Sequence, residues 1–271
     1  MGQLISVMIV GADGFIGSSA TQKLSKQYHC IPIHKTNNID FTNYNQVKQL
    51  LETTRPDVVL NCLAYSSKHC VDNPGEEVGK NLSMFYNFYA NKHLYNQYIN
   101  IGSGAEFDRS TNIDVALECD IFNVLPNDAY GFNKNLVARL IADASDKFIT
   151  LRIFGCFGPS EWSSRLLKRF IQTPNFVLEN DRYFDYVSID DFLTVVKHVI
   201  DNRITALDCN VVYDEKILLS EFLNRFCKIH EKYSKFVVSS NSYKNYTGSS
   251  AKLNSLCLRL SGLDVGLKNY L

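Results

Sequence analysis

The fold is decided near the start of the chain, where residues 7–17 read VMIVGADGFIG. The first four residues are apolar and predict a buried strand, and the last three begin a helical pattern. Gly11, Gly14 and Gly17 allow a tight turn, the approach of a pyrophosphate to the backbone, and close packing of helix on strand. Free amides at the helix start then accept phosphates, so we expect these glycines, Phe15 and Ile16 to bind a dinucleotide.

Short apolar runs alternate with helical patterns through the first half of the chain. We expect strands at 6–10, 30–33, 58–60, 97–102 and 148–153, and helices at 15–26, 44–53, 76–92 and 130–145. The glycine spacing is G-x-x-G-x-x-G and not the general G-x-G-x-x-G, but it falls at the first strand–helix junction, as a dinucleotide site requires. Strand–helix alternation with right-handed crossovers predicts an α/β fold with a parallel, doubly wound sheet.

Beyond residue 155 the pattern becomes irregular. Helical spacing returns at 163–172 and 189–201, and the stretch 237–250, which is rich in Ser, Asn and Tyr, predicts a surface loop. We therefore expect a cofactor-binding domain over 1–155. The remainder, 156–271, is expected to form mainly a small α/β substrate lobe, with some segments returning to the first domain.

The composition is that of a globular protein without bulk charge. The 271 residues are 45% hydrophobic, and 28 basic side chains balance 28 acidic ones, so no field draws the chain to nucleic acid or membrane. No apolar stretch reaches the ~20 residues of a membrane helix, and the N-terminus does not resemble a signal peptide. The eight cysteines form no C-x-x-C pair. We expect reduced, mainly buried thiols, no metal site and a cytoplasmic location.

The end of the second expected strand bears on the choice of cofactor. In NAD-binding proteins an acidic residue there holds the ribose 2′-hydroxyl, whereas a cation pairs with the 2′-phosphate of NADP. Here the strand leads into His34 and Lys35, and the next carboxylate along the chain is Asp40. We therefore favour NADP(H), with NAD(H) as the alternative, and expect Asp40 and Phe41 to contact the adenine.

A tyrosine and a lysine begin the helix expected at 130–145. Tyr130 and Lys134 are four residues apart and therefore lie on one helix face. A tyrosine with its ordinary pKa of about 10 carries protons poorly at neutral pH, and a nearby ammonium lowers that pKa. Tyr130 would then protonate a developing alkoxide. Ser103, just after the strand 97–102, is expected at the same carboxyl edge of the sheet, where it can bond the same substrate oxygen.

The glycine turn, the serine and the Tyr-x-x-x-Lys pair occur in the order typical of one family. Residues 6–200 resemble the extended short-chain dehydrogenases/reductases, in the group of NAD-dependent epimerases, dehydratases and reductases of nucleotide sugars. The resemblance implies a Rossmann sheet in which Ser103, Tyr130 and Lys134 are catalytic, with Tyr130 and Lys134 also against the cofactor. It further implies cofactor contacts by Leu63, Ala64, Tyr65 and Asn81.

The substrate residues are also suggested mainly by the resemblance. Residues 182–187, RYFDYV, are similar to a family segment whose arginine contacts the substrate nucleotide, which implicates Arg182. Arg165 is a second guanidinium suited to a diphosphate. Trp162 lies just past Gly158-Pro159, where the family's substrate loop begins. The remaining candidates follow two strand ends: Ser66, Lys68, Ser103 and Gly104.

The residues after Ser103 discriminate among the family's reactions. The 4,6-dehydratases carry an Asp-Glu pair there, whereas this chain has Gly104 and Ala105, which disfavours dehydration. GDP-fucose synthases have a cysteine in place of Ala105 and a histidine after the Gly-Pro pair, and this chain has neither. The segment 55–61, RPDVVLN, and Phe107-Asp108 resemble dTDP-4-dehydrorhamnose reductases.

We therefore expect an NAD(P)H-dependent reductase of a nucleotide-linked 4-keto-6-deoxy sugar. The alternatives within the family are a nucleotide-sugar 4-epimerase, or a 3,5-epimerase/4-reductase, with the same triad. A non-catalytic NADP-sensing regulator is the alternative from another class, although such proteins tend to lose the tyrosine. The expected partner is a nucleotide-diphosphate sugar, and the resemblance implies a homodimer.

Overall fold

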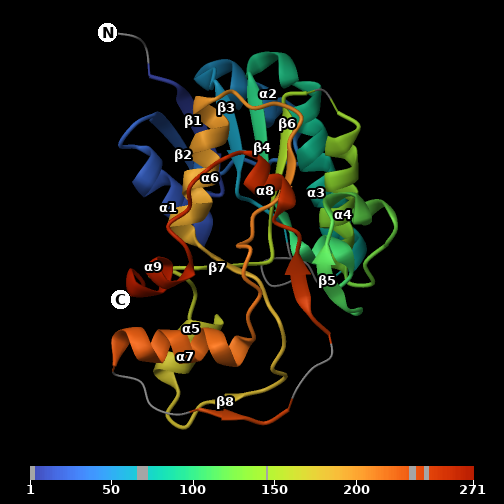
Figure 1. The fold of residues 1–271 in the computed structure, drawn as a ribbon. Helices are drawn as coiled ribbons and strands as arrows, with labels where there is room; N and C mark the ends of the chain where they lie inside the picture. The colour runs from blue at the N-terminus through green and yellow to red at the C-terminus, as the bar shows by residue number, and fades with distance from the viewer. Residues whose placement is uncertain (1–3, 66–72, 145, 232–235, 241–243) are drawn as a thin grey trace.

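A six-stranded parallel sheet forms the centre of the protein (Figure 1). The structure is a computed structural model that describes residues 4–65, 73–144, 146–231, 236–240 and 244–271. The strand order is β10-β6-β4-β3-β1-β2, and every neighbouring pair is parallel. The strands are β1 (Ser6–Val10), β2 (His29–Ile33), β3 (Val58–Asn61), β4 (Gln97–Ser103), β6 (Phe148–Ile153) and β10 (Asp208–Asn210). This arrangement confirms the predicted doubly wound α/β fold.

Helices cover both faces of the sheet, which explains the continuous apolar runs of its strands. Successive side chains point to opposite faces, so Val7 and Ile9 belong to one core cluster, and Met8 and Val10 to the other. The first face is covered by α1 (Phe15–Leu24), α6 (Ile189–Asp201) and α8 (Ala251–Ser255). The second is covered by α2 (Tyr44–Thr54), α3 (Pro74–Ala90) and α4 (Ala129–Ala142).

A smaller lobe lies beyond the carboxyl ends of the strands, at the bottom of Figure 1. It contains two short parallel pairs, β7 (Gly155–Phe157) with β9 (Tyr186–Ser188) and β8 (Val177–Leu178) with β11 (Val237–Val238). Its helices are α5 (Leu166–Gln172), α7 (Leu219–His230) and α9 (Leu263–Lys268). An aromatic core that includes Phe157 and Phe222 holds the lobe together. The chain returns from the lobe to the sheet domain with α6 and β10, and a second time with α8 after α7 and β11.

The prediction that 237–250 is a surface loop is wrong for part of this stretch. Residues Tyr246–Gly248 form β12, which pairs with β5 (Ile113–Ala116), and the side chain of Tyr246 is only 6% exposed. The composition of the segment did not predict this strand, because the pairing of distant strands is decided by tertiary context. One consequence is that the C-terminal third of the chain reaches the carboxyl end of β4.

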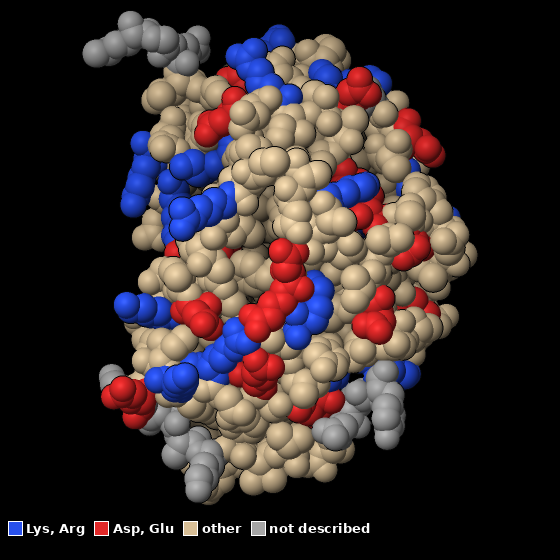
Figure 2. Space-filling model, viewed as in Figure 1, with Lys and Arg blue, Asp and Glu red and all other residues tan. Residues whose placement is uncertain are grey.

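Basic and acidic side chains both lie on the face shown in Figure 2, in keeping with their equal numbers in the sequence. Among the described helices, none is both long and apolar enough to cross a membrane. Cys119 is exposed, contrary to the expectation of burial, because it lies in the surface 3-10 helix η4 (Glu118–Phe122) and not in a strand.

Candidate active site

The glycine turn joins β1 to α1 in the way the sequence predicts. Gly11 has a φ of +80°, and a Cβ on Gly17 would lie 2.2 Å from the carbonyl oxygen of Gly11, so the protein itself requires both glycines. A Cβ on Gly14 would approach only the oxygen of Gly11, at 3.5 Å. Gly14 is also the N-cap of α1, without a side-chain cap. The packing of the fold therefore does not itself explain the glycine at position 14. A glycine at a helix start with free N–H groups does fit the close approach of a pyrophosphate.

A carboxylate that the sequence analysis overlooked lies beside the end of β2. Asp13 Oδ1 is 2.8 Å from His34 Nδ1, and Asp13 Oδ2 accepts a 2.6 Å bond from the backbone N–H of Lys35. The bonds from the Lys35 backbone and the His34 ring hold the pKa of Asp13 below its usual range. The expected 2′-phosphate site therefore contains an ionised carboxylate between two basic residues.

The turn expected to contact adenine is fixed by its own side chains. Asp40 Oδ1 accepts bonds from the backbone N–H and the hydroxyl of Thr42, at 2.9 and 2.7 Å. Phe41 is 6% exposed, and its ring stacks on Phe88 with a centroid distance of 5.9 Å. The ring of Phe41 thus belongs to the core, which leaves the backbone of this turn as the surface for a ligand.

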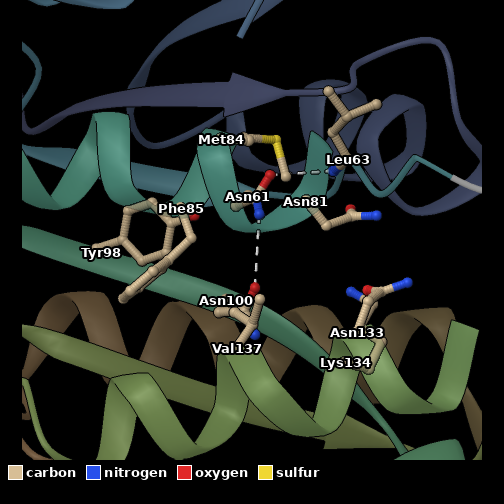
Figure 3. A pocket seen from close by; sticks show the side chains of 10 residues that line it. All are labelled: Asn61, Leu63, Asn81, Met84, Phe85, Tyr98, Asn100, Asn133, Lys134 and Val137. Atoms are coloured by element: carbon tan, nitrogen blue, oxygen red, sulfur yellow. Dashed lines mark hydrogen bonds between the residues drawn. The ribbon is translucent and has the colours of Figure 1, made fainter. Parts of the chain in front are cut away.

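A small pocket brings together three of the predicted cofactor residues, Leu63, Asn81 and Lys134 (Figure 3). The other lining residues are Asn61, Met84, Phe85, Tyr98, Asn100, Asn133 and Val137. Asn81 bonds both the N–H and the carbonyl of Tyr65, at 3.0 and 2.9 Å, and so fixes the loop of Leu63, Ala64 and Tyr65 after β3. Asn81 therefore shapes this pocket through the backbone of Tyr65.

Lys134 lies on α4 with its ammonium buried against β4. Its Nζ donates a 2.8 Å bond to the carbonyl of Ile101, and the residue is 8% exposed. Within the described part of the chain this is its one hydrogen-bond acceptor, so two N–H groups are left for a ligand. Because a buried cation with so few partners is costly, the geometry favours a bound group beside it.

Tyr130 lies in the first turn of α4, at the point where this helix meets the end of β4. A Cβ on Gly131 would lie 2.6 Å from the carbonyl oxygen of Ala105, so glycine allows α4 to approach the 3-10 helix η3 (Gly104–Phe107). The guanidinium of Arg109 lies over the ring of Tyr130, 5.6 Å from its centroid. Arg109 also donates a 2.7 Å bond to Asp128, the N-cap of α4. Sequence reasoning missed this second cation.

Ser103 ends β4 and caps η3. Its hydroxyl oxygen accepts a 3.2 Å bond from the N–H of Ala105, and its own N–H donates to Glu106 Oε1 at 2.7 Å. Glu106 in turn forms a fully buried ion pair with Arg152, with 2.5 Å between Oε2 and Nε. The backbone of the predicted catalytic serine is therefore anchored to a charge network inside the sheet, which the sequence analysis did not foresee.

The two predicted substrate arginines belong to the lobe, with Arg165 as the N-cap of α5 and the guanidinium of Arg182 over the ring of Phe184, 5.4 Å from its centroid. Burial raises the pKa of Tyr186, and the charges of Arg165, Glu161 and Arg182 act on it as well. Nε of Arg182 is buried and has no hydrogen-bond partner among the described residues. An unpaired buried guanidinium nitrogen is suited to an anion. Trp162 precedes this group on an exposed loop and is 49% exposed.

The remaining predicted substrate residues are Gly104, Ser66 and Lys68. A Cβ on Gly104 would lie 2.4 Å from the ring of Phe154, so packing against that ring already requires this glycine. Ser66 and Lys68 lie outside the described residues. No group of three or more metal-ligating side chains occurs within the described ranges.

The comparison with known families identifies the class of protein that this fold and site define. The sequence matches the NAD dependent epimerase/dehydratase family over residues 7–211, and the chain therefore belongs to that family. It is an NAD(P)-dependent enzyme of the extended short-chain dehydrogenase/reductase type. A related sequence is the CDP-abequose synthase of Yersinia pseudotuberculosis, 23% identical over 218 residues, which cover 72% of this chain and 73% of that protein.

Solved structures of similar fold come from nucleotide-sugar enzymes. The dTDP-4-dehydrorhamnose reductase of Bacillus anthracis in complex with NADP superimposes with a TM-score of 0.82 at 15% identity, over 100% of this chain and 98% of that one. The GDP-mannoheptose C4 reductase of Campylobacter jejuni with NADP bound gives 0.81 at 16% identity, with the same coverage. The UDP-glucose 4-epimerase of Thermotoga maritima with UDP-glucose gives 0.76 at 17% identity, over 98% and 97%. These similarities confirm the Rossmann fold.

Proposed function

We propose that the protein is an NADP(H)-dependent reductase of a nucleotide-linked 4-keto-6-deoxy sugar. One observation carries this proposal: the serine that ends β4 and the Tyr–Lys helix α4 meet at the carboxyl edge of the sheet, beside the glycine turn. Gly104 and Ala105, which cannot exchange protons, follow the serine and disfavour dehydration. The similar structures from Bacillus anthracis and Campylobacter jejuni are reductases with bound NADP, which supports the same assignment.

The cofactor residues are drawn from the glycine turn, the end of β2 and the pocket beside α4. Gly11, Gly14 and Gly17 with the first turn of α1 would hold the pyrophosphate, and Lys35 with His34 the 2′-phosphate. Lys134 would bond the nicotinamide ribose through the N–H groups that Ile101 leaves free. When bound, NADPH supplies a hydride to the substrate carbonyl carbon.

The protein's own residues then handle the oxygen of that carbonyl. Ser103 would donate a hydrogen bond that orients the carbonyl group. Tyr130 would pass its phenolic proton to the oxygen as negative charge develops there, which yields the alcohol. The ammonium of Lys134 on the next turn of α4 and the guanidinium of Arg109 over the ring favour the phenolate that remains. Solvent returns the proton to Tyr130 before the next turnover.

The diphosphate of the substrate is assigned to the lobe. Arg182, with its unpaired buried Nε, and Arg165, the N-cap of α5, would supply two guanidinium groups there. Guanidinium groups bind phosphate oxygens in a bidentate manner. This arrangement would place the sugar between the lobe and the edge of the sheet, with Trp162 at the rim as a surface for sugar or base.

The test is NADPH oxidation by the purified protein with a panel of dTDP-, GDP-, CDP- and UDP-linked 4-keto-6-deoxyhexoses. We expect one member to be reduced, and Tyr130→Phe to lower kcat by at least about 100-fold, because a positioned proton donor typically contributes ~10²–10⁴. Full activity of Tyr130→Phe would refute the mechanism. Failure of the whole panel would refute the reductase.

A 4-epimerase is the second candidate, supported by the similarity to the UDP-glucose 4-epimerase structure. An epimerase reoxidises what it reduces, so it consumes no net NADPH and keeps its cofactor through purification. We expect the opposite behaviour here, with cofactor that exchanges during gel filtration. Tightly retained NAD together with interconversion of two nucleotide sugars would favour the epimerase.

A further inference from the structure

A fully buried carboxylate bonds the backbone of the candidate catalytic serine. Glu106 is the third residue of η3 and is 0% exposed. Its Oε1 accepts the N–H of Ser103 at 2.7 Å, and its Oε2 lies 2.5 Å from Nε of Arg152. Its backbone carbonyl accepts a 2.8 Å bond from the side-chain amide of Asn135, which follows Lys134 on α4. One residue therefore joins the end of β4, the neighbouring strand β6 and the helix of the Tyr–Lys pair.

The local sequence explains half of this arrangement. In a capping box, the residue before a helix and the third residue of the helix each bond the backbone with their side chains. Ser103 and Glu106 hold these positions, and the Ser103 hydroxyl also accepts the N–H of Ala105 at 3.2 Å. A glutamine completes such a box as well as a glutamate does. The cap alone therefore does not explain a charged side chain that has no contact with water.

The charge of Glu106 is matched by a network that crosses the sheet. Arg152 is likewise 0% exposed, and its Nη1 lies 2.9 Å from Oδ1 of Asp208 and 3.1 Å from Oδ1 of Asn210, both on β10. A Cβ on Gly102 would lie 2.8 Å from Oε1 of Glu106, so the glycine at this position of β4 makes room for the carboxylate. The ion pair is thus built into β4, β6 and β10.

A buried ion pair of this kind is a poor source of stability. The cost of removing two charges from water offsets much of their attraction, and apolar side chains of similar volume often replace such a pair without loss. Burial raises the pKa of Glu106, and the charge of Arg152 acts against that rise. Arg152 therefore favours the ionised carboxylate, which is a stronger acceptor for the Ser103 N–H than a neutral acid would be.

We propose that Glu106 is a positioning residue, whose carboxylate, held by Arg152, fixes the backbone of Ser103 and thereby the direction of the serine hydroxyl. This inference rests on the proposed reductase function and adds a residue to its machinery. Because Glu106 has no exposed surface, it acts through Ser103 and does not contact the substrate. The bond from Asn135 ties η3 to α4, so the serine is held in place beside the helix that carries Tyr130.

The experiment measures NADPH oxidation with the panel member that the unmodified protein reduces. Glu106→Leu removes the acceptor of the Ser103 N–H, whereas Glu106→Gln removes the charge and keeps an acceptor oxygen. In both variants Arg152 retains Asp208 as an ionic partner. For each variant we measure kcat, KM for NADPH, KM for the sugar and the unfolding midpoint in urea.

Gln97→Leu is the matched control for a lost buried polar side chain. Gln97 is 6% exposed at the opposite end of β4, where its amide donates a 2.7 Å bond to the carbonyl of Ile204. The substitution should lower the unfolding midpoint, as loss of a buried hydrogen bond does, and leave kcat unchanged.

We expect Glu106→Leu to lower kcat about tenfold or more, because a small displacement of a catalytic group slows the reaction strongly. KM for NADPH should stay the same. Glu106→Gln should recover at least about fivefold of the lost kcat, since glutamine can still complete the capping box. A merely structural role would lower the unfolding midpoint and leave kcat intact. Full activity of Glu106→Leu, or equal kcat in the two variants, would overturn the inference.

A second pair of variants keeps the test decisive if Glu106→Leu does not fold. Glu106→Leu combined with Arg152→Met replaces the whole ion pair by apolar side chains, which buried sites often tolerate. Glu106→Gln combined with Arg152→Met retains the acceptor for Ser103 in the same background. The first should again be the slower of the two, and equal rates would contradict the proposal.

Ser103→Ala separates this inference from the proposed function. If Glu106 acts through the serine, adding Glu106→Leu to Ser103→Ala should cause no further loss of kcat, and losses that multiply would overturn the inference. Full activity of Ser103→Ala would refute the catalytic serine and with it the proposed mechanism. A slow Ser103→Ala beside a fully active Glu106→Leu would leave the reductase intact and refute only the role of Glu106. If the unmodified protein reduces no panel member, the reductase fails first and the role of Glu106 fails with it.

Discussion

Opposite charges meet at the end of β2, where single residues select the cofactor. The Asp13 carboxylate holds the ring of His34 and the backbone of Lys35, which leaves the Lys35 ammonium as the cation for a 2′-phosphate. Asp13 itself disfavours a further anion at this place and is available to a ribose hydroxyl. The preference for NADP(H) therefore depends on the balance between these two residues.

Lys35→Ala should weaken NADPH selectively. We expect KM for NADPH to rise about tenfold, the effect of ~1.4 kcal/mol of lost binding, while KM for NADH stays unchanged because NADH lacks the 2′-phosphate. Steady-state kinetics with both cofactors measure the ratio. Lys26→Ala, another exposed lysine, is the matched control. An equal change for both cofactors would show that Lys35 does not contact the 2′-phosphate.

At the scale of residues, the sequence predicted what local spacing encodes. Tyr130 and Lys134 are four apart on one helix, so their common face follows from helix geometry. Arg109 belongs to a segment that approaches Tyr130 only after folding. Asp13 was within the quoted glycine turn, but its bonds to His34 and Lys35 require the pairing of β1 with β2.

The contact between α4 and η3 sets the geometry of the candidate site at the scale of elements. Gly131→Ala would place a Cβ 2.6 Å from the oxygen of Ala105 and 2.9 Å from Cβ of Pro126. We expect α4 to shift, with kcat lower by about 10–100-fold because Tyr130 and Ser103 no longer align. The free energy of unfolding should fall by about 1–3 kcal/mol.

The matched control for this helix variant is Gly79→Ala on α3. No atom lies within 4 Å of a Cβ there, so the substitution should keep full activity and stabilise by up to ~1 kcal/mol through helix propensity. Turnover and urea denaturation are measured for both variants. If Gly131→Ala behaved like Gly79→Ala, the close packing of α4 on η3 would not determine catalysis.

The buried carboxylate of Asp185 links the Arg182–Tyr186 segment to β12 and makes the stability of the protein depend on pH. Asp185 accepts 2.8 Å bonds from Lys216 Nζ and from the N–H of Gly248, yet burial raises its pKa from 3.8 to about 6. Between those values the folded chain holds a proton that the unfolded chain has released. This group therefore contributes stability at low pH, and the contribution is lost as the pH rises through about 6.

Comparison with Asp185→Asn isolates that contribution. From about pH 5 to about pH 7.5, the unfolding free energy of the unmodified protein should fall by about 1.4 kcal/mol relative to the variant. Urea denaturation at a series of pH values provides the measurement. If the unfolding free energy of the unmodified protein, relative to that of the variant, stayed constant or rose over this pH range, the pKa of Asp185 would not be raised.

At the scale of the whole molecule, the strands of the sheet were predictable, whereas most strands and helices of the expected lobe were not. The apolar runs of β1, β3, β4 and β6 are buried on both faces, so they stand out in the sequence. The lobe has strands of two or three residues, too short to give a periodic signal, and its helices are held by aromatic contacts between distant segments. The pairing of β12 with β5 could not be predicted for the same reason.

The homodimer implied by the resemblance is a prediction at this scale. Its interface is expected on α4 and its neighbour α3, where the ring of Tyr86 is 50% exposed. Light scattering should give twice the mass of one chain, and Tyr86→Glu should give a monomer, because an interface core tolerates charge poorly. Tyr44→Glu, at a tyrosine on α2 that is 45% exposed, should stay dimeric. A monomeric unmodified protein would refute the dimer.

Transfer of label from the cofactor tests the central claim, that this site reduces a sugar carbonyl, most directly. The protein is incubated with NADPH deuterated at the transferable C4 position and with the keto sugar found in the panel. Mass spectrometry and NMR then locate the deuterium in a single turnover. The account predicts one deuterium on the former carbonyl carbon and none in the product of Tyr130→Phe on the same time scale. A product without deuterium, or conversion of the sugar without loss of NADPH, would contradict it.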